Sequence, residues 1–146
     1  LLAGEPRHKI AFIAHMAVLR EVSASGQVTL VLEDDALPVS NVSSRLAEYM
    51  YQLPLGWGYL DISACCNFHG GKRVSQNMYS RQGMGRTRGL VAYVITPRCA
   101  ADVVKAYEFE IRIKYFVDRW MSDSLSVCNV YWAEPMLFKH GDSMRH

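Results

Sequence analysis

The sequence lacks any uninterrupted apolar run that approaches the ~18–20 residues of a transmembrane helix, although half of its 146 residues are hydrophobic. We therefore expect no membrane-spanning segment. Charge of one sign is also scarce: the formal net charge is +2, which indicates neither nucleic acid nor an anionic membrane as a partner. Because internal repeats and low-complexity segments are absent as well, we expect one domain, residues 1–146, with a single core.

Cysteine occurs four times, at Cys65, Cys66, Cys99 and Cys128. This spacing matches neither a paired metal-binding motif nor the dense pattern of a small secreted scaffold. We expect the adjacent pair Cys65–Cys66 to be free thiols in a reducing compartment, and the protein to be cytoplasmic. No signal peptide is visible, but the sequence begins with Leu1 rather than Met, as expected if its natural N-terminus is missing.

One stretch combines an apolar run with three consecutive acids. Residues 28–32 are mostly β-branched or aliphatic, which is typical of a strand buried on both faces of a sheet. Glu33, Asp34 and Asp35 follow directly, and three adjacent carboxylates repel one another unless a cation lies between them. Carboxylate oxygens suit Mg²⁺ and Mn²⁺, and α/β folds bind ligands at this end of their strands. The alternative is a solvated acidic turn in which an Asp caps the next helix.

Hydrophobic patterns and breakers predict the other elements. Helices are expected at 8–22, from Ser40 or Asn41 to about 52, from Pro97 (capped by Thr96) to about 107, and from Asp118 to 127. Strands are expected at 28–32, 59–63, 89–95 and 130–132, with a turn at 36–38 and an irregular tail from 137. The order strand, helix, strand favours a parallel βαβ unit. The fold class is therefore α/β, with a mixed, mostly parallel sheet flanked by helices.

The longest stretch without periodicity, residues 67–88, is rich in glycine, serine and basic residues. It is too long for an idle connection in a compact domain, and guanidinium groups match phosphate oxygens in shape and charge. It is therefore a candidate anion-binding loop, the alternative being a solvated surface loop. The basic residues that would bind the anion are Lys72, Arg73, Arg81, Arg86 and Arg88.

The order of the motifs resembles glycosyltransferase family 25, the sugar transferases of lipopolysaccharide and collagen type with a GT-A, Rossmann-like fold. Residues 32–38, LEDDALP, look like the LEDDA motif that follows a hydrophobic strand in that family. Residues 53–60 are similar to its LP-x-x-W-D-x-L segment, with Gly58 where the family has Asp. Further resemblances are Ala14-His15 (Ser-His in the family), 89–97 (G-x-x-A-Y-x-I-S), Val117-Asp118 and Glu134-Pro135. The family begins with a strand and helix that hold the nucleotide base, and nothing before His8 matches them, so we expect a truncated or abbreviated N-terminus.

The resemblance implies transfer of a sugar from a nucleotide donor, a UDP-sugar, to a hydroxyl of a glycan or protein. Mn²⁺ or Mg²⁺ would stabilise the diphosphate as it leaves. Asp35 would bind the metal directly and Glu33 directly or through water, because residues two apart in an extended chain point to the same side. His140 in the tail would complete the coordination, the alternative being an exposed tail histidine.

Other roles follow from the same resemblance. Asp118 would be the base that takes the proton of the acceptor hydroxyl, although from the local sequence alone a helix cap is the stronger interpretation. Asp34 would face the ribose, and Arg86 and Arg88 would hold the diphosphate. His15 would reach the donor from its helix, the alternative being a core histidine bonded to backbone.

Two further functions stay open at this point. One is a non-catalytic nucleotide- or sugar-binding module with a degenerate transferase fold, and the other is a divalent-metal phosphotransferase. An uncovered apolar sheet edge would also lead to self-association as a homo-oligomer.

Overall fold

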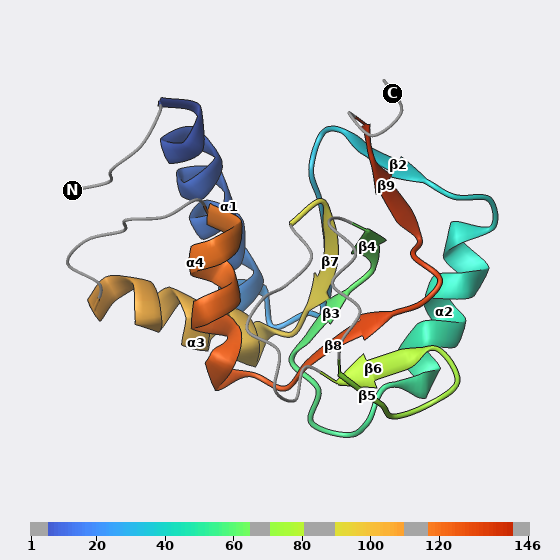
Figure 1. Cartoon of the computed structure of the whole chain (residues 1–146). Coiled ribbons are helices and arrows are strands. Elements are labelled where there is room, and N and C mark those ends of the chain that lie inside the picture. Colours follow the sequence, from blue (N-terminus) through green and yellow to red (C-terminus); the bar gives the residue numbers. More distant parts are fainter. Residues whose placement is uncertain (1–5, 65–70, 81–89, 110–116, 142–146) are drawn as a thin grey trace.

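The computed structural model describes residues 6–64, 71–80, 90–109 and 117–141 of the chain (Figure 1). Its helices are α1 (Pro6–Ser25), α2 (Val42–Gln52), α3 (Pro97–Phe109) and α4 (Val117–Ser124), with a 3₁₀ turn η1 (Leu125–Val127). Its strands are β1 (Thr29–Leu32), β2 (Ala36–Pro38), β3 (Tyr59–Asp61), β4 (Ser63–Ala64), β5 (Lys72–Arg73), β6 (Met78–Ser80), β7 (Ala92–Ile95), β8 (Val130–Ala133) and β9 (Phe138–His140). The four predicted helices are confirmed. The Thr96 cap is confirmed too, since its hydroxyl accepts a hydrogen bond from the amide of Cys99 at 3.3 Å.

Six strands form a sheet in the order β1-β7-β3-β8-β6-β5, and three form a second sheet in the order β2-β9-β4. The prediction of a mixed sheet flanked by helices is confirmed, but the prediction of mostly parallel strands is wrong. Within the described part of the large sheet, only β3 and β8 pair in parallel. The expected βαβ strands, β1 and β3, do run in the same direction, but β7 lies between them and pairs antiparallel to both. Hydrophobic patterns predict strands, not their order, so this insertion was not visible in the sequence.

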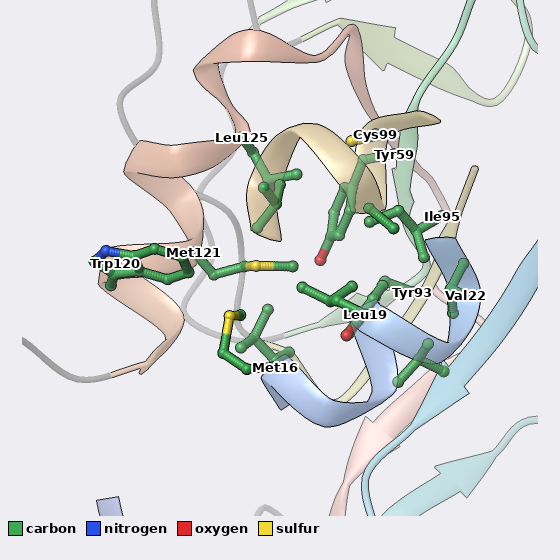
Figure 2. Packing of buried hydrophobic residues seen from close by; sticks show 14 of the residues in the cluster. Met16, Leu19, Val22, Tyr59, Tyr93, Ile95, Cys99, Trp120, Met121 and Leu125 are labelled. Atoms are coloured by element: carbon green, nitrogen blue, oxygen red, sulfur yellow. The ribbon is translucent and has the colours of Figure 1, made fainter. Parts of the chain in front are cut away.

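Two hydrophobic cores lie on the two faces of the large sheet. Alternate residues of β7 contribute to each: Tyr93 and Ile95 to one core, Ala92 and Val94 to the other. The first core is closed by α1, α3 and α4, and the second by α2, which lies on the opposite side of the sheet (Figure 1). Figure 2 shows the first core, where side chains of α1 meet those of α3 and α4 above the sheet. Each large side chain buried here stabilises the fold by about 1.5–3 kcal/mol.

Helix α1 buries only one of its two apolar stripes. Phe12, Met16 and Leu19 are buried, whereas Ile10 and Ile13 are 68% and 58% exposed. The apolar residues on more than one side of this helix suggest a largely buried helix, but α1 is buried on one side only, because it covers the sheet from one side and nothing described covers its outer face.

Strand β1 lies at the edge of the large sheet, so the expectation of a strand buried on both faces is also wrong. Val31 is buried in the core beneath α1, but Leu30 and Leu32 are 40% and 46% exposed. They pair in register with Val94 and Ala92 of β7, which are buried in the second core. On this face of the sheet, the second core therefore covers β7 but not β1, and the exposed leucines of β1 form an apolar edge.

The segments expected to be a turn (36–38) and an irregular tail both contain strands. β2 and β9 pair antiparallel, with Ala36 opposite His140, as seen where the two arrows run side by side in Figure 1. Such pairing between distant segments overrides weak local preferences. In the same way, the described part of the predicted anion-binding loop contains the β5–β6 hairpin. The Arg73 guanidinium donates there to the carbonyls of Ser75 and Gln76, so it holds its own turn.

A disulfide joins Cys99 of α3 to Cys128, with the two Cα atoms 5.7 Å apart. This pairing was not predicted from the spacing of the cysteines, and Cys65 and Cys66 lie outside the described residues. Gly58 lies against the bond: a Cβ there would come within 3.1 Å of the Cβ atoms of both cysteines. Disulfides persist in oxidising compartments, so the cytoplasmic location stays a prediction and the bond argues against it. Among the described helices, none is both long and apolar enough to cross a membrane.

Candidate functional site

The three acids occupy a tight turn that leads from the large sheet into the small one. The Glu33 amide donates to the carbonyl of Val91 at 2.9 Å, which extends the pairing of β1 with β7 by one residue. The Ala36 amide then donates to the carbonyl of Glu33 at 3.2 Å and closes the turn. The prediction of an extended chain through the acids is therefore wrong. The side-chain directions of Glu33 and Asp35 cannot be inferred from the alternation of side chains along a strand.

Asp35 is paired with His140 across the two sheet-forming segments β2 and β9. The Nε2 atom of His140 lies 3.2 Å from Oδ2 of Asp35. The backbone fixes this meeting, because Ala36 is opposite His140 and the Gly141 amide donates to the carbonyl of Asp35 at 3.0 Å. The two residues that the sequence assigned to one metal site are thus in contact, although about a hundred positions separate them.

The other oxygen of Asp35, Oδ1, is buried and has no hydrogen-bond partner in the described structure. Leaving such a group unsatisfied costs about 1–3 kcal/mol, and more when it is charged. A cation bound at Oδ1 would remove that cost, and a carboxylate beside an imidazole suits Mn²⁺ and other divalent metals. The donor set of Asp35 and His140 therefore fits a metal.

Glu33 belongs to a second, more deeply buried group. The Nε2 atom of His15 lies 3.2 Å from Oε1 of Glu33, and its Nδ1 atom lies 3.1 Å from the hydroxyl of Tyr93. Burial, together with the negative charge of Glu33, raises the pKa of the Tyr93 hydroxyl well above its usual value. His15 is thus buried as expected for a core histidine, but it bonds side chains rather than backbone and is tied to the acidic turn.

The structure does not bring all predicted ligands together. Among the described residues, no group of three or more His, Cys, Asp or Glu side chains is close enough to hold a metal ion. The two pairs, Asp35–His140 and Glu33–His15, stand separately, and Asp34 is exposed. The metal site therefore remains a prediction. Of its three expected ligands, Asp35 and His140 are in contact with each other, and Glu33 is paired with His15.

Several predicted residues lie outside the described part of the chain. Arg86 and Arg88 fall in the range 81–89, so their proposed contact with a diphosphate stays a prediction. Asp118 is the second residue of α4, and its side chain is not described. Its two readings, helix cap and catalytic base, both stay open.

Two residues near the site were not assigned a role from sequence. Tyr93 lies in the middle of an apolar strand, where a tyrosine instead of a phenylalanine signals that its hydroxyl has a buried partner. Asp61, which ends β3 and is the kind of carboxylate that metal-dependent phosphate chemistry uses, is buried, and its Oδ1 accepts hydrogen bonds of 2.9 Å from both the amide and the hydroxyl of Ser63. That bonding gives Asp61 a structural role at the connection between β3 and β4.

Comparison of the chain with models of protein families, with curated proteins and with solved structures finds no match. The resemblance to glycosyltransferase family 25 therefore stays a prediction. It rests on the residues and motifs of the sequence.

Proposed function

We propose that the chain is a metal-dependent glycosyltransferase of the family 25 type, with a GT-A-like fold. It would move a sugar from a nucleotide donor, a UDP-sugar, to a hydroxyl of a glycan or protein. The observation that carries the proposal is the pair of Asp35 and His140, two residues assigned to one metal from sequence, with a buried and unpartnered carboxylate oxygen beside them.

Each residue has a distinct task in this proposal. Asp35 and His140 hold Mn²⁺ or Mg²⁺, and Glu33 binds the same ion directly or through water. The ion supplies positive charge that stabilises the departing diphosphate. Asp34, exposed on the turn, would contact the donor, Arg86 and Arg88 would bind its phosphates, and Asp118 would accept the proton of the acceptor hydroxyl. His15, expected from sequence to reach the donor, has both ring nitrogens bonded and would act through Glu33.

A second candidate is a non-catalytic module that binds a nucleotide or sugar. It is favoured by the absence of a three-residue metal group from the described part of the chain. A divalent-metal phosphotransferase is supported less, because the buried carboxylate of Asp61 is bonded to Ser63. The apolar edge at β1 supports self-association in either case, because an open edge strand can pair with another strand.

The test is calorimetric titration of UDP into the protein with and without Mn²⁺. Asp35→Asn removes the charge of the central ligand, and Asp123→Asn makes the same change at an exposed position of α4. We expect UDP binding that requires Mn²⁺, weakened at least about tenfold by Asp35→Asn and unchanged by Asp123→Asn. Absence of UDP binding in wild type under both conditions would refute the transferase. Metal-dependent binding without transfer from any UDP-sugar would favour the binding module.

A further inference from the structure

Tyr93 lies at the centre of a buried aromatic stack that leads to the acidic turn. Its ring stacks on that of Tyr59, with centroids 5.0 Å apart, and on the imidazole of His15, with centroids 6.0 Å apart. Leu19 and Ile95 lie next to it in the core (Figure 2). The stack fixes the plane of the His15 ring from one side and leaves its two nitrogens to be satisfied by hydrogen bonds.

The hydrogen-bond directions in this group follow from its chemistry. Because burial keeps the Tyr93 hydroxyl protonated, it needs an acceptor, and within the described chain its partner is Nδ1 of His15. A neutral imidazole that accepts at Nδ1 carries its hydrogen on Nε2. Nε2 faces Oε1 of Glu33, which is an acceptor when ionised. When Tyr93 donates to His15 and His15 donates to Glu33, every donor in the group meets an acceptor.

We propose that Tyr93 is a positioning residue: its hydroxyl donates to Nδ1 of His15, sets the tautomer with the hydrogen on Nε2, and so fixes the carboxylate of Glu33 at the end of β1. The part of this inference that concerns metal binding, in which Tyr93 helps to orient Glu33 for the ion, rests on the proposed function. A glutamate side chain is otherwise free to rotate, and the Glu33 side chain is 31% exposed. With Oε1 held by His15, its second oxygen is oriented before a cation arrives, as outer partners orient ligands in metal sites.

The first test reads the tautomer directly and needs no metal or nucleotide. Long-range proton–nitrogen NMR spectra of the imidazole rings, at a slightly alkaline pH, show which nitrogen carries the hydrogen, and His15→Gln assigns the signal. We expect His15 of wild type to carry it on Nε2 alone. In Tyr93→Phe, which keeps the ring and removes the hydroxyl, we expect signals shifted towards a mixture of the two tautomers. Tyr59→Phe removes a hydroxyl from the same stack and should leave the His15 signals as in wild type.

A wild-type His15 that carries its hydrogen on Nδ1 would overturn the proposal even if Tyr93→Phe does not fold. An unchanged His15 spectrum in folded Tyr93→Phe would overturn it as well.

The second test measures Mn²⁺-dependent binding of UDP to wild type, Tyr93→Phe and Tyr59→Phe. Because Tyr93 acts through His15, we expect Tyr93→Phe to weaken binding about tenfold, the low end for outer partners of metal ligands, and Tyr59→Phe to have no effect. Equal affinity of wild type and Tyr93→Phe refutes the metal-organising role but leaves the proposed function intact. If wild type binds no UDP, the proposed function fails together with that role, while the NMR result still decides the hydrogen-bond assignment.

Discussion

The disulfide between Cys99 and Cys128 gives the sharpest quantitative prediction for this fold. The bond ties α3 to the segment that enters β8, and the half-cystine at position 99 is only 2% exposed. Reducing it should leave the native contacts in place, because the buried thiol of Cys99 and the partly buried thiol of Cys128 are small and apolar. The main effect should therefore be on the unfolded chain, which gains the freedom that the cross-link removes.

The size of the effect follows from the sequence separation of 29 between the two cysteines. The chain-entropy relation gives an entropy of about 12 cal/mol/K for a loop of this length, or about 3.6 kcal/mol at 25 °C. For a domain of this size, such a loss corresponds to a decrease in melting temperature of about 10–15 °C. The loss is a large fraction of the 5–15 kcal/mol by which domains are usually stable.

The assay is urea unfolding, followed by circular dichroism, with and without reductant. All measurements use the background Cys65→Ser/Cys66→Ser, so that the reductant acts on one bond. In this background, Cys99→Ala/Cys128→Ala should have the same stability as the reduced protein. A thiol reagent should find no reactive thiol in the unreduced background protein after denaturation. Two reactive thiols there, or equal stability with and without reductant, would refute the reasoning.

Two further predictions concern alkaline stability and self-association. The unfolded state should release the Tyr93 proton near pH 10, its ordinary pKa, whereas the folded state holds it to higher pH; stability is therefore complete below pH 10 and falls above it, by up to about 1.4 kcal/mol per pH unit. Unfolding free energies from pH 9 to 11 should fall more steeply in wild type than in Tyr93→Phe, and equal slopes would contradict the assignment. Leu30→Lys places a charge on the open edge of β1 and should reduce self-association in sedimentation experiments. The exposed control Ser43→Lys should not, and association that neither variant changes would exclude this edge as the interface.

The helices and the central strands could be predicted because their signals are local. The Thr96-Pro97 start of α3 and the apolar run of β7 depend on a few neighbouring residues, and both are found where expected. Strand order and exposure depend on distant segments. The run of β1 looks like a core strand, yet it lies at an edge because, among the described strands, β7 is its one partner.

The candidate site was predictable in part for the same reason. Asp35 and His140 were linked by resemblance to a family motif, and their contact depends on the pairing of β2 with β9, whose local sequence predicted a turn and a tail. The role of Tyr93 was not visible, because a tyrosine in an apolar strand does not name its partner. The glycine at position 58, a departure from the family pattern, has a physical explanation in the disulfide pressed against it.

The late position of β9 has a consequence for biosynthesis. The ribosome delivers the acidic turn about a hundred residues before His140, so during translation the carboxylates have no imidazole to meet. The small sheet also waits for β9, since β2 and β4 pair with it and not with each other. The contact between Asp35 and His140 therefore forms only after residues 138–140 have been made, whereas the turn's bonds from Glu33 to Val91 and from Ala36 to Glu33 do not need β9. A nascent chain that has not yet made β9 would therefore lack one of the ligands of the proposed metal site, and we expect it to bind Mn²⁺ more weakly than the folded chain.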